Sequence, residues 1–267
     1  MSKKYVLMCD YGLDDAAATA FVLDSRADGD LVDVMPIGGN SEKRVAYRNG
    51  QTLLANYDGS LDGVRVVDTR EEEQPYANLP SIHGEDGMGD LFAPETSTVP
   101  VVAFSEWLKE TDEIVLVSLG PCTLTEKIIE KRKVSLLLVM GGCVDAEPNF
   151  HGYEFNHYLD IPAFNACMKF GRTAVATLDA CRIPRFNLVG KNIEGDGLTA
   201  IFLKRSRDLA VARHPDNCYV YDYIAVHYLF EKAKIAIKTD RENNTVREIV
   251  FADNASLSAR NRPKQKT

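Results

Sequence analysis

The sequence predicts an α/β fold with a mostly parallel central sheet and helices on both of its faces. Short apolar runs rich in β-branched residues alternate with helix-like segments, and this alternation is typical of parallel strands connected by helices. The 267 residues suffice for one large domain. Apolar residues make up 45% of the chain and charged residues 26%, which suits a globular protein with a substantial core.

The elements follow one another in the order that such a fold needs. The run YVLM opens the chain as a strand, and the alanine-rich segment after it is expected to be a helix. The expected strands are residues 5–8, 31–37, 64–67, 113–118, 134–140 and 173–178. The expected helices are residues 14–23, 42–55, 99–109, 124–131, 161–170 and 223–233. We expect one domain over residues 1–267, with a polar, frayed tail from about 253 to 267.

Composition excludes several classes of protein. A net charge of −8 argues against nonspecific binding of nucleic acid. No apolar run is long enough to span a membrane, and no secretory signal precedes the first strand. The six cysteines form no CxxC pair and sit in apolar surroundings, as reduced thiols do. We therefore expect a cytoplasmic protein with no membrane partner.

Three carboxylates crowd the end of the first strand. Asp10 ends the strand, Gly12 permits a tight turn, and Asp14 and Asp15 open the next helix. Helix capping explains one or two of these acids, because acids favour helix N-termini. It does not explain Asp10, and like charges this close raise one another's pKa unless a cation intervenes. From these residues alone, capping and a hard divalent cation bound by oxygen ligands are about equally supported.

Polar side chains also follow other predicted strands, where parallel sheets place their ligands. Asn40 comes after a Gly-Gly turn, and His83 sits in a glycine-rich loop. In an extended segment, Glu154 and Asn156 point to the same side, as two groups gripping sugar hydroxyls would. Asp222 precedes an apolar helix, where capping is the simpler explanation. Each of these residues alone is explained as well by a turn, an exposed loop or a cap.

Several alternative sites lack their motifs. The five histidines form no HExxH, which argues against zinc. No GxGxxG follows the first strand, no GxxxxGK[ST] is present, and no nucleophile elbow appears. A phosphohydrolase with Asp10 as nucleophile would need a second acid at position 12, which is glycine.

Taken in order, these segments resemble the nucleoside hydrolase family, the inosine-uridine preferring nucleoside N-ribohydrolases. The resemblance covers residues 5 to about 232. The pieces that carry it are Asp10-Tyr11-Gly12-Leu13-Asp14-Asp15-Ala16, Gly39-Asn40, Ile82-His83-Gly84, Gly120-Pro121-x-Thr123, Met140-Gly141-Gly142, Glu154-Phe155-Asn156 and Asp222. Each piece is weak alone, but seven pieces in this order are specific.

The resemblance implies a Rossmann-like open α/β fold and a Ca²⁺ cofactor. The implied ligands of the ion are Asp10, Asp15, Asp222 and the main-chain carbonyl of Thr123. The ribose hydroxyls would be held by Asp14, Asn40, Asn149, Glu154 and Asn156. Asp10 would act as the general base on a water molecule that attacks the anomeric carbon, and His83 would lie near the base. The resemblance also implies a small-molecule nucleoside or riboside substrate, a role in purine or pyrimidine salvage, and a homodimer or homotetramer.

Four positions depart from the family pattern. Met8 stands where an aspartate is usual, Tyr11 where a proline is usual, and Leu124 where an asparagine is usual. Tyr221 occupies the place of a histidine before the last metal-binding aspartate and is expected to line the substrate site. Two functions follow as hypotheses: a Ca²⁺-dependent hydrolase of N-glycosidic bonds, or a ribose- or nucleoside-binding protein with little turnover on the same scaffold.

Overall fold

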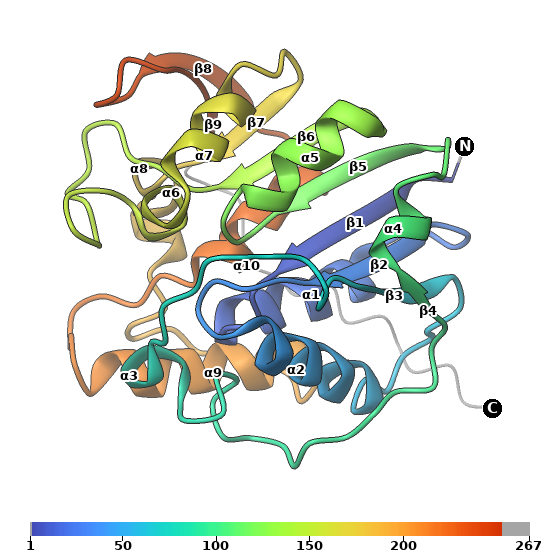
Figure 1. Cartoon of the computed structure of the whole chain (residues 1–267). Coiled ribbons are helices and arrows are strands. Elements are labelled where there is room, and N and C mark those ends of the chain that lie inside the picture. Colours follow the sequence, from blue (N-terminus) through green and yellow to red (C-terminus); the bar gives the residue numbers. More distant parts are fainter. Residues whose placement is uncertain (1, 253–267) are drawn as a thin grey trace.

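A nine-stranded sheet forms the centre of the computed structural model, which describes residues 2–252 (Figure 1). The spatial order of the strands is β4-β3-β2-β1-β5-β6-β7-β9-β8. The strands are β1 Lys4–Cys9, β2 Leu31–Pro36, β3 Val64–Asp68, β4 Val101–Ala103, β5 Glu113–Ser118, β6 Lys133–Met140, β7 Thr173–Ala176, β8 Lys234–Thr239 and β9 Thr245–Val250. Every pairing is parallel except that of β8 with β9. The predicted mostly parallel α/β fold is therefore confirmed.

The helices cover both faces of the sheet. They are α1 Leu13–Ser25, α2 Lys43–Ala55, α3 Pro80–His83, α4 Phe104–Trp107, α5 Thr123–Lys131, α6 Phe155–Leu159, α7 Ile161–Met168, α8 Leu178–Cys181, α9 Leu198–Val211 and α10 Tyr221–Val226. Two 3₁₀ turns, η1 Pro184–Phe186 and η2 His227–Leu229, complete the described elements. Parallel strands buried on both sides read as continuous apolar runs, and β1 is such a run.

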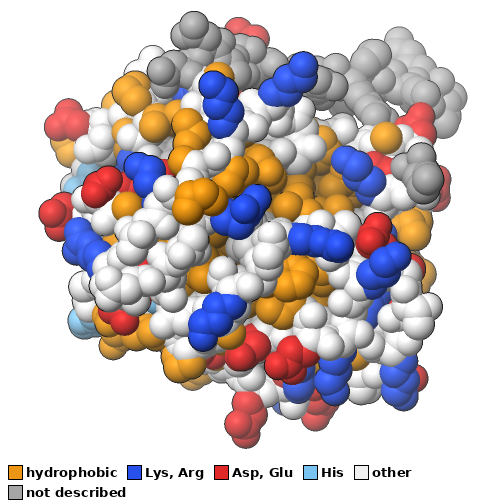
Figure 2. Space-filling model, turned by 90° about the horizontal axis from the view of Figure 1, so that it is seen from above, with side chains coloured by type: hydrophobic (Ala, Val, Ile, Leu, Met, Phe, Trp, Pro, Cys, Tyr) orange, Lys and Arg blue, Asp and Glu red, His pale blue; other side chains and the backbone are white. Residues whose placement is uncertain are grey.

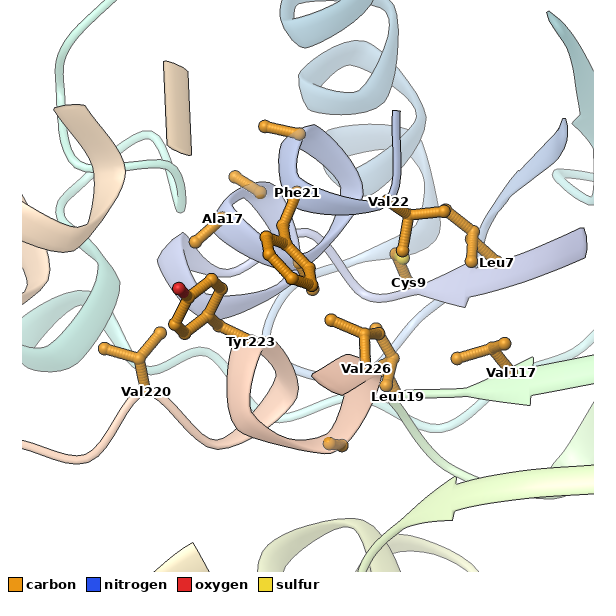
Figure 3. Packing of buried hydrophobic residues seen from close by; sticks show 14 of the residues in the cluster. Leu7, Cys9, Ala17, Phe21, Val22, Val117, Leu119, Val220, Tyr223 and Val226 are labelled. Atoms are coloured by element: carbon orange, nitrogen blue, oxygen red, sulfur yellow. The ribbon is translucent and has the colours of Figure 1, made fainter. Parts of the chain in front are cut away.

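Alternate residues of β1 belong to two separate cores. Leu7 and Cys9 pack with Phe21 of α1 and Tyr223 of α10 on one face, the packing drawn in Figure 3. The same core includes apolar residues of α2 and α9. Met8 packs on the other face, in the core to which α4, α5 and α7 contribute. This two-residue period fixes which face of β1 each side chain meets.

Three of the predicted elements are wrong in part. Residues 99–109 were expected to be one helix, but Val101–Ala103 pairs with β3 as an edge strand before the short helix α4; their β-branched side chains suit a pleated edge. The strand expected to reach residue 178 ends at Ala176, because Thr177 caps α8 by accepting the N–H of Ala180 at 3.1 Å. The helix expected over 223–233 is α10 followed by the 3₁₀ turn η2.

Several further elements escaped prediction, and one predicted segment is not described. Beside the short helices α3, α6 and α8, they are helix α9 and the hairpin β8–β9, both in the C-terminal third of the chain. α9 mixes charged and apolar residues without a clean stripe, and β8 is a half-exposed edge strand. The polar tail predicted from about residue 253 lies outside the described residues.

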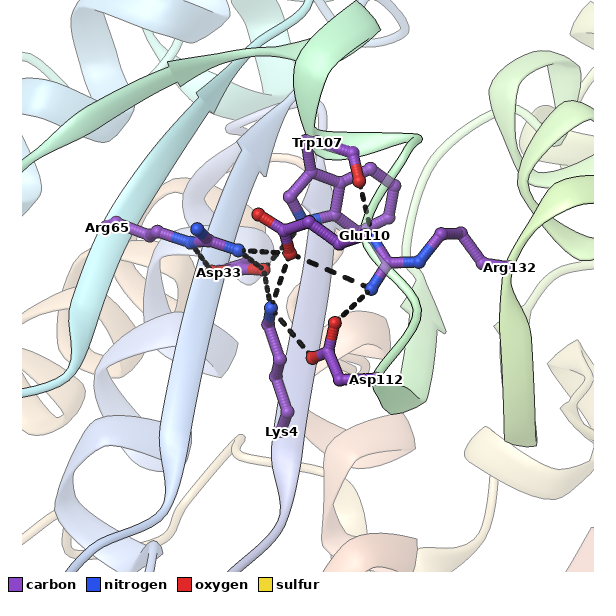
Figure 4. Close-up of polar contacts among 7 residues, drawn as sticks. All are labelled: Lys4, Asp33, Arg65, Trp107, Glu110, Asp112 and Arg132. Carbon is purple, nitrogen blue, oxygen red and sulfur yellow. Dashed lines mark hydrogen bonds and ion pairs between the residues drawn. The ribbon is translucent and has the colours of Figure 1, made fainter.

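A network of charged side chains joins β1, β2 and β3 to the loop after α4 (Figure 4). Asp33 accepts from Arg65 at 2.5 and 3.0 Å and from the indole N–H of Trp107 at 2.6 Å. The ammonium of Lys4 lies 3.3 Å from the same carboxylate and 2.8 Å from Glu110. Because Lys4 begins β1, this network lies at the end of the sheet opposite the carboxyl ends of the strands.

The molecular surface in Figure 2 carries both charge signs. Lys and Arg side chains stand singly or in small groups between apolar and neutral surface on this face. On the part of this face that belongs to residues 2–252, the positive charges form no continuous stripe. No helix within residues 2–252 has both the length and the apolar character that crossing a membrane requires.

Candidate active site

Three carboxylates from two helix N-termini converge at the carboxyl end of β1. Asp14 and Asp15 lie in the first turn of α1, and Asp222 lies in the first turn of α10. One oxygen of each lies within 4.8 Å of one oxygen of each of the others. Helix N-termini favour negative charge, which explains the placement of each acid but not the meeting of all three. Helix packing brings together residues more than 200 positions apart.

Burial makes this cluster of like charges costly. Asp15 and Asp222 are buried, and burial first and the neighbouring carboxylates second raise the pKa of both well above the ordinary range. Asp15 accepts from the N–H of Gly12 at 3.0 Å, so capping explains this residue. Oδ1 of Asp14 and Oδ1 of Asp222 are buried and have no hydrogen-bond partner within residues 2–252. Those unpartnered oxygens need a positive partner, which capping does not supply.

Asp10 stands beside the triad of Asp14, Asp15 and Asp222 but faces a different partner. Its Oδ2 accepts the main-chain N–H of Asn40 and its Oδ1 accepts the side-chain amide of Asn40, both at 2.8 Å. Burial raises the pKa of Asp10 to about 6, while the Asn40 hydrogen bonds oppose that shift. A Cβ on Gly39 would lie 1.9 Å from Oδ2 of Asp10, so this approach requires glycine.

The backbone conformation at Tyr11 explains why this chain lacks the proline that is usual in the family directly after Asp10. Its backbone φ is +49°, a left-handed conformation that proline cannot adopt. Its ring is fully buried and contacts the position of Gly50. This backbone is therefore incompatible with the usual proline, and burial of the ring offsets the cost of the left-handed conformation.

A pocket opens directly above the carboxylates and contains most of the predicted site residues. Its lining includes carboxylates and amides: Asp14, Asn40, Asn149, Glu154, Asn156 and Asp222. It also includes hydrogen-bond donors and rings: His83, Ser206, Arg213, Tyr219 and Tyr221. Apolar side chains such as Leu79, Ile82 and Ala210 complete the lining. The pocket thus has the concave, mostly apolar wall with a few convergent polar groups that is typical of small-molecule sites.

The amide and carboxylate side of the pocket is held rigidly. Oε2 of Glu154 accepts the N–H groups of Gly142 and His157, each at 3.0 Å, and Glu154 caps α6. Burial raises the pKa of Glu154 to about 7. The amide of Asn156 donates to the carbonyl oxygens of Leu119 at 3.0 Å and Met140 at 3.2 Å.

On this side, Asn149 has a supporting contact of its own. Its Oδ1 accepts the N–H of Phe155 at 2.9 Å. This hydrogen bond spans the segment between Asn149 and α6 and fixes Asn149 at the pocket wall.

His83 and Tyr221 also line the pocket, and Nδ1 of His83 lies 3.7 Å from Oδ1 of Asp14. Nδ1 of His83 accepts the N–H of Leu13 at 3.1 Å, and burial lowers the pKa of the ring, so the neutral imidazole carries its proton on Nε2. The hydroxyl oxygen of Tyr221 accepts from Nε of Arg182 at 3.1 Å, and burial raises the pKa of Tyr221. Both predicted residues therefore reach the pocket, each with its orientation set by a neighbour.

Thr123 is not brought to this pocket. It begins α5, its hydroxyl donates to Asp160 at 2.6 Å, and it lines a separate groove beside Glu72 and Glu126. Leu119, which directly precedes the Gly120-Pro121 turn, lines the pocket instead. The sequence signal for Leu119 was its place at the end of β5, where main-chain carbonyls face the carboxyl edge of the sheet.

Ser206 and Arg213 are two further pocket residues that sequence reasoning missed. Both come from α9 or the residues just after it, and α9 packs on α1 and α3. No motif marks them, because the surrounding sequence is an unpatterned mixture of charged and apolar residues.

The model of the family described as inosine-uridine preferring nucleoside hydrolase matches residues 5–265. The chain belongs to this nucleoside hydrolase family. A curated relative, the inosine-uridine preferring nucleoside hydrolase of Leishmania major, is 28% identical over 177 residues, which are 60% of this chain and 55% of the relative. The chain thus matches little more than half of that relative's length.

Solved structures with other names share the nucleoside hydrolase fold. A purine-preferring ribonucleoside hydrolase from Gardnerella vaginalis superposes with a TM-score of 0.69 at 19% identity, covering 94% of each chain. The type III effector protein XopQ complexed with adenosine diphosphate ribose superposes with a TM-score of 0.58 at 14% identity, covering 97% of this chain and 90% of the effector. The predicted family and fold class are confirmed.

Proposed function

We propose that the protein hydrolyses the N-glycosidic bond of a nucleoside or related riboside with the help of a divalent cation, Ca²⁺. The observation that carries this proposal is the triad of Asp14, Asp15 and Asp222. Two of its buried oxygens have no hydrogen-bond partner within residues 2–252, and the triad adjoins a pocket lined by amides and carboxylates. Family membership supports the reaction class.

The carboxylates fit a hard cation. Oxygen ligands and flexible geometry suit Ca²⁺ better than soft metals. Asp15 and Asp222 belong both to the set that the resemblance implies and to the observed triad, and we assign them as ligands. The third carboxylate is Asp10 in the implied set and Asp14 in the triad. A bound cation would relieve the repulsion among these acids and lower the pKa of a nearby water.

We assign Asp10 as the general base. A pKa of about 6 leaves most of its carboxylate ionised at neutral pH while keeping it basic enough to take a proton from water. The two hydrogen bonds from Asn40 fix its orientation. The water oxygen would bond to the anomeric carbon as the C–N bond breaks, and the water proton would pass to Asp10.

The acidic side of the pocket suits the sugar. Positive charge develops on the ribose ring in an oxocarbenium-like transition state, and carboxylates fixed nearby favour that charge. Glu154 and Asn156 are both buried and hydrogen-bonded to the backbone, so they lose little freedom on binding ribose.

Ribose release tests the proposal. Protein stripped with a chelator is incubated with a panel of nucleosides, with and without added Ca²⁺, and free ribose is measured. We expect release that depends on Ca²⁺ and is lost in Asp222→Asn. The matched control is Asp62→Asn, which removes an exposed carboxylate far from the pocket and should leave activity unchanged.

Calorimetry assigns the third ligand. If Asp14 holds the ion, Asp14→Asn should weaken Ca²⁺ binding far more than Asp10→Asn. The opposite ranking would favour Asp10 as the third ligand, as the resemblance implies.

A binding protein is the second candidate function. Met8, Leu124 and Tyr221 depart from the family pattern, and XopQ, which shares the fold, is recorded as a complex with adenosine diphosphate ribose. Nucleoside binding without ribose release from any substrate would contradict the hydrolase and favour this alternative.

A further inference from the structure

The groups that line the pocket differ in hydrogen-bonding character according to the element that carries them. Those from α1, α6 and α10 include the acceptor carboxylates of Asp14, Glu154 and Asp222. Those from α3 and α9 are donors. Nε2 of His83 carries a proton because Nδ1 already accepts from the N–H of Leu13. His83 also adjoins the carboxylates, because its Nδ1 lies 3.7 Å from Oδ1 of Asp14. If the ribose binds among the carboxylates, the donors left for its aglycone (the base that leaves) are those of His83 and α9.

The hydroxyl of Ser206 is a further donor, and no acceptor within residues 2–252 pairs with it. Its hydroxyl oxygen is fully buried and has no hydrogen-bond partner within residues 2–252. Ser206 also lines the pocket. Burying a hydroxyl without a hydrogen-bond partner costs free energy. A hydrogen bond from Ser206 to a bound ligand would remove that cost and would explain why the hydroxyl is there.

Arg213 adds a positive charge without a counter-ion. It lines the same pocket from the C-terminal side of α9, and its charge acts on His83. No carboxylate of residues 2–252 forms an ion pair with it, although arginines 65, 132, 185 and 205 are each paired. Its side chain is exposed at the mouth of the pocket, where it can meet the distal edge of an aglycone.

From this arrangement we propose that Arg213 selects ribosides whose aglycone carries negative charge on its distal edge. This inference rests on the proposed function and names its substrate class. Suitable aglycones are bases with a carboxylate substituent or oxo-bases that ionise near neutral pH. The guanidinium would pair with that charge, and Ser206 and His83 would donate to the remaining acceptors.

The charge of Arg213 also suits bond cleavage. When the C–N bond breaks, its electron pair moves onto the base nitrogen, the water oxygen bonds to the anomeric carbon, and the water proton goes to Asp10. The departing base then carries one more negative charge than the bound aglycone, until solvent protonates it. Arg213 faces this additional negative charge, so its effect extends from binding to departure.

Matched pairs of substrates test the selection. 5-Carboxyuridine and uridine differ by one carboxylate, and xanthosine and inosine differ by one oxo group that makes the base acidic. The wild-type protein should favour the charged member of each pair in kcat/KM. Arg213→Gln should reduce that preference about tenfold, and Arg213→Lys should retain most of it. High salt should weaken the wild-type preference, because the pair is partly exposed.

The outcomes separate this inference from the proposed function. An unchanged preference in Arg213→Gln would overturn the role of Arg213 while leaving the hydrolase intact. Absence of ribose release from every substrate, p-nitrophenyl riboside included, would instead reject the hydrolase. Binding of xanthine, measured by calorimetry, gives a readout without turnover: Arg213→Gln should weaken it about tenfold, and equal affinity would again overturn the proposal. Arg207→Gln, which removes an arginine of α9 that pairs with Asp208, is the matched control.

Discussion

Asn40 donates two hydrogen bonds to the carboxylate of Asp10, one from its main-chain N–H and one from its side-chain amide, both 2.8 Å long. Residues from the ends of two neighbouring strands thus form one unit. Because both bonds favour the ionised carboxylate, they hold the pKa of Asp10 below the value that burial alone would impose. The same bonds aim its lone pairs and limit its rotation.

Replacing Asn40 should therefore move the acidic limb of the pH–rate profile. Asn40→Ala removes the side-chain bond and keeps the main-chain bond, so the pKa of Asp10 should rise above about 6. The rate falls as pH drops through that pKa, and the loss should begin at a higher pH in the variant. The measurement is kcat/KM from pH 5 to 9. Asn192→Ala, on an exposed loop, is the control, and coincident profiles would contradict the role given to Asn40.

Gly39 lets the turn approach Asp10 closely enough for the hydrogen bonds from Asn40, and it cannot be replaced by alanine. A Cβ there would lie 1.9 Å from Oδ2 of Asp10, so either the carboxylate or the turn must shift. We expect Gly39→Ala to reduce kcat by about 100-fold or more, because a displacement near 1 Å is costly for a positioned base. Gly171→Ala is the matched control, since nothing lies within 4 Å of its new methyl group. Normal activity in Gly39→Ala would show that the position of Asp10 is not critical.

The sequence predicted the acidic half of the site well, for a physical reason. Parallel strands place their carboxyl ends at one edge, so polar residues after each strand could be expected to meet, and Asn40, Glu154 and Asp222 do so. Ser206 and Arg213 were not predictable in the same way, although His83 and Tyr221 were. Ser206 and Arg213 reach the pocket through the packing of α9 on α1 and α3, and no local pattern encodes such long-range packing.

Finer features also escaped sequence reasoning. The left-handed backbone of Tyr11 depends on burial of its ring, and the contact of Asp10 with Asn40 depends on how closely Gly39 approaches. The contact of the Thr123 hydroxyl with Asp160 links residues 37 positions apart. Each of these outcomes depends on tertiary contacts within a few ångströms.

Removing the ion should give the protein an unusual dependence of stability on pH. Folding raises the pKa of Asp10 to about 6 and that of Glu154 to about 7, and it raises those of Asp15 and Asp222 as well. The folded state therefore binds protons more tightly than the unfolded chain, whose carboxyl groups titrate near pH 4. Ion-free protein should gain stability as pH falls from 8 toward 5.

Thermal unfolding checks this dependence. The Tm of ion-free protein should rise on going from pH 8 to pH 5.5, and Ca²⁺ should raise the Tm more at pH 8, where the four carboxylates carry more negative charge than at pH 5.5. Below about pH 4 the trend should reverse, because hydrogen bonds from Arg65 and Lys4 outweigh burial and lower the pKa of Glu110 to about 2. A Tm that falls steadily from pH 8 to 5.5 without the ion would contradict the repulsion assigned to the site.

The charged network at the other end of the sheet should govern stability without affecting chemistry. Asp33 is buried and accepts from Arg65 and Trp107, while the ammonium of Lys4 lies 3.3 Å away. Asp33→Asn keeps the shape but removes the charge that both cations face. Breaking one partner of a buried pair is costly, so we expect a loss of about 3 kcal/mol in the free energy of unfolding. Denaturant titration measures that loss, and Asp62→Asn is the exposed control.

Asp33→Asn also tests whether the charged network at one end of the sheet affects catalysis at the other end. Since the network lies at the start of β1 and the pocket at the carboxyl ends of the strands, Asp33→Asn should keep kcat and KM at temperatures where it remains folded. A large loss of kcat in folded Asp33→Asn would mean that the β1–β2 pairing transmits changes to Asp10. In that case the unit formed by Asp10 and Asn40 would depend on the alignment of the two strands that carry it.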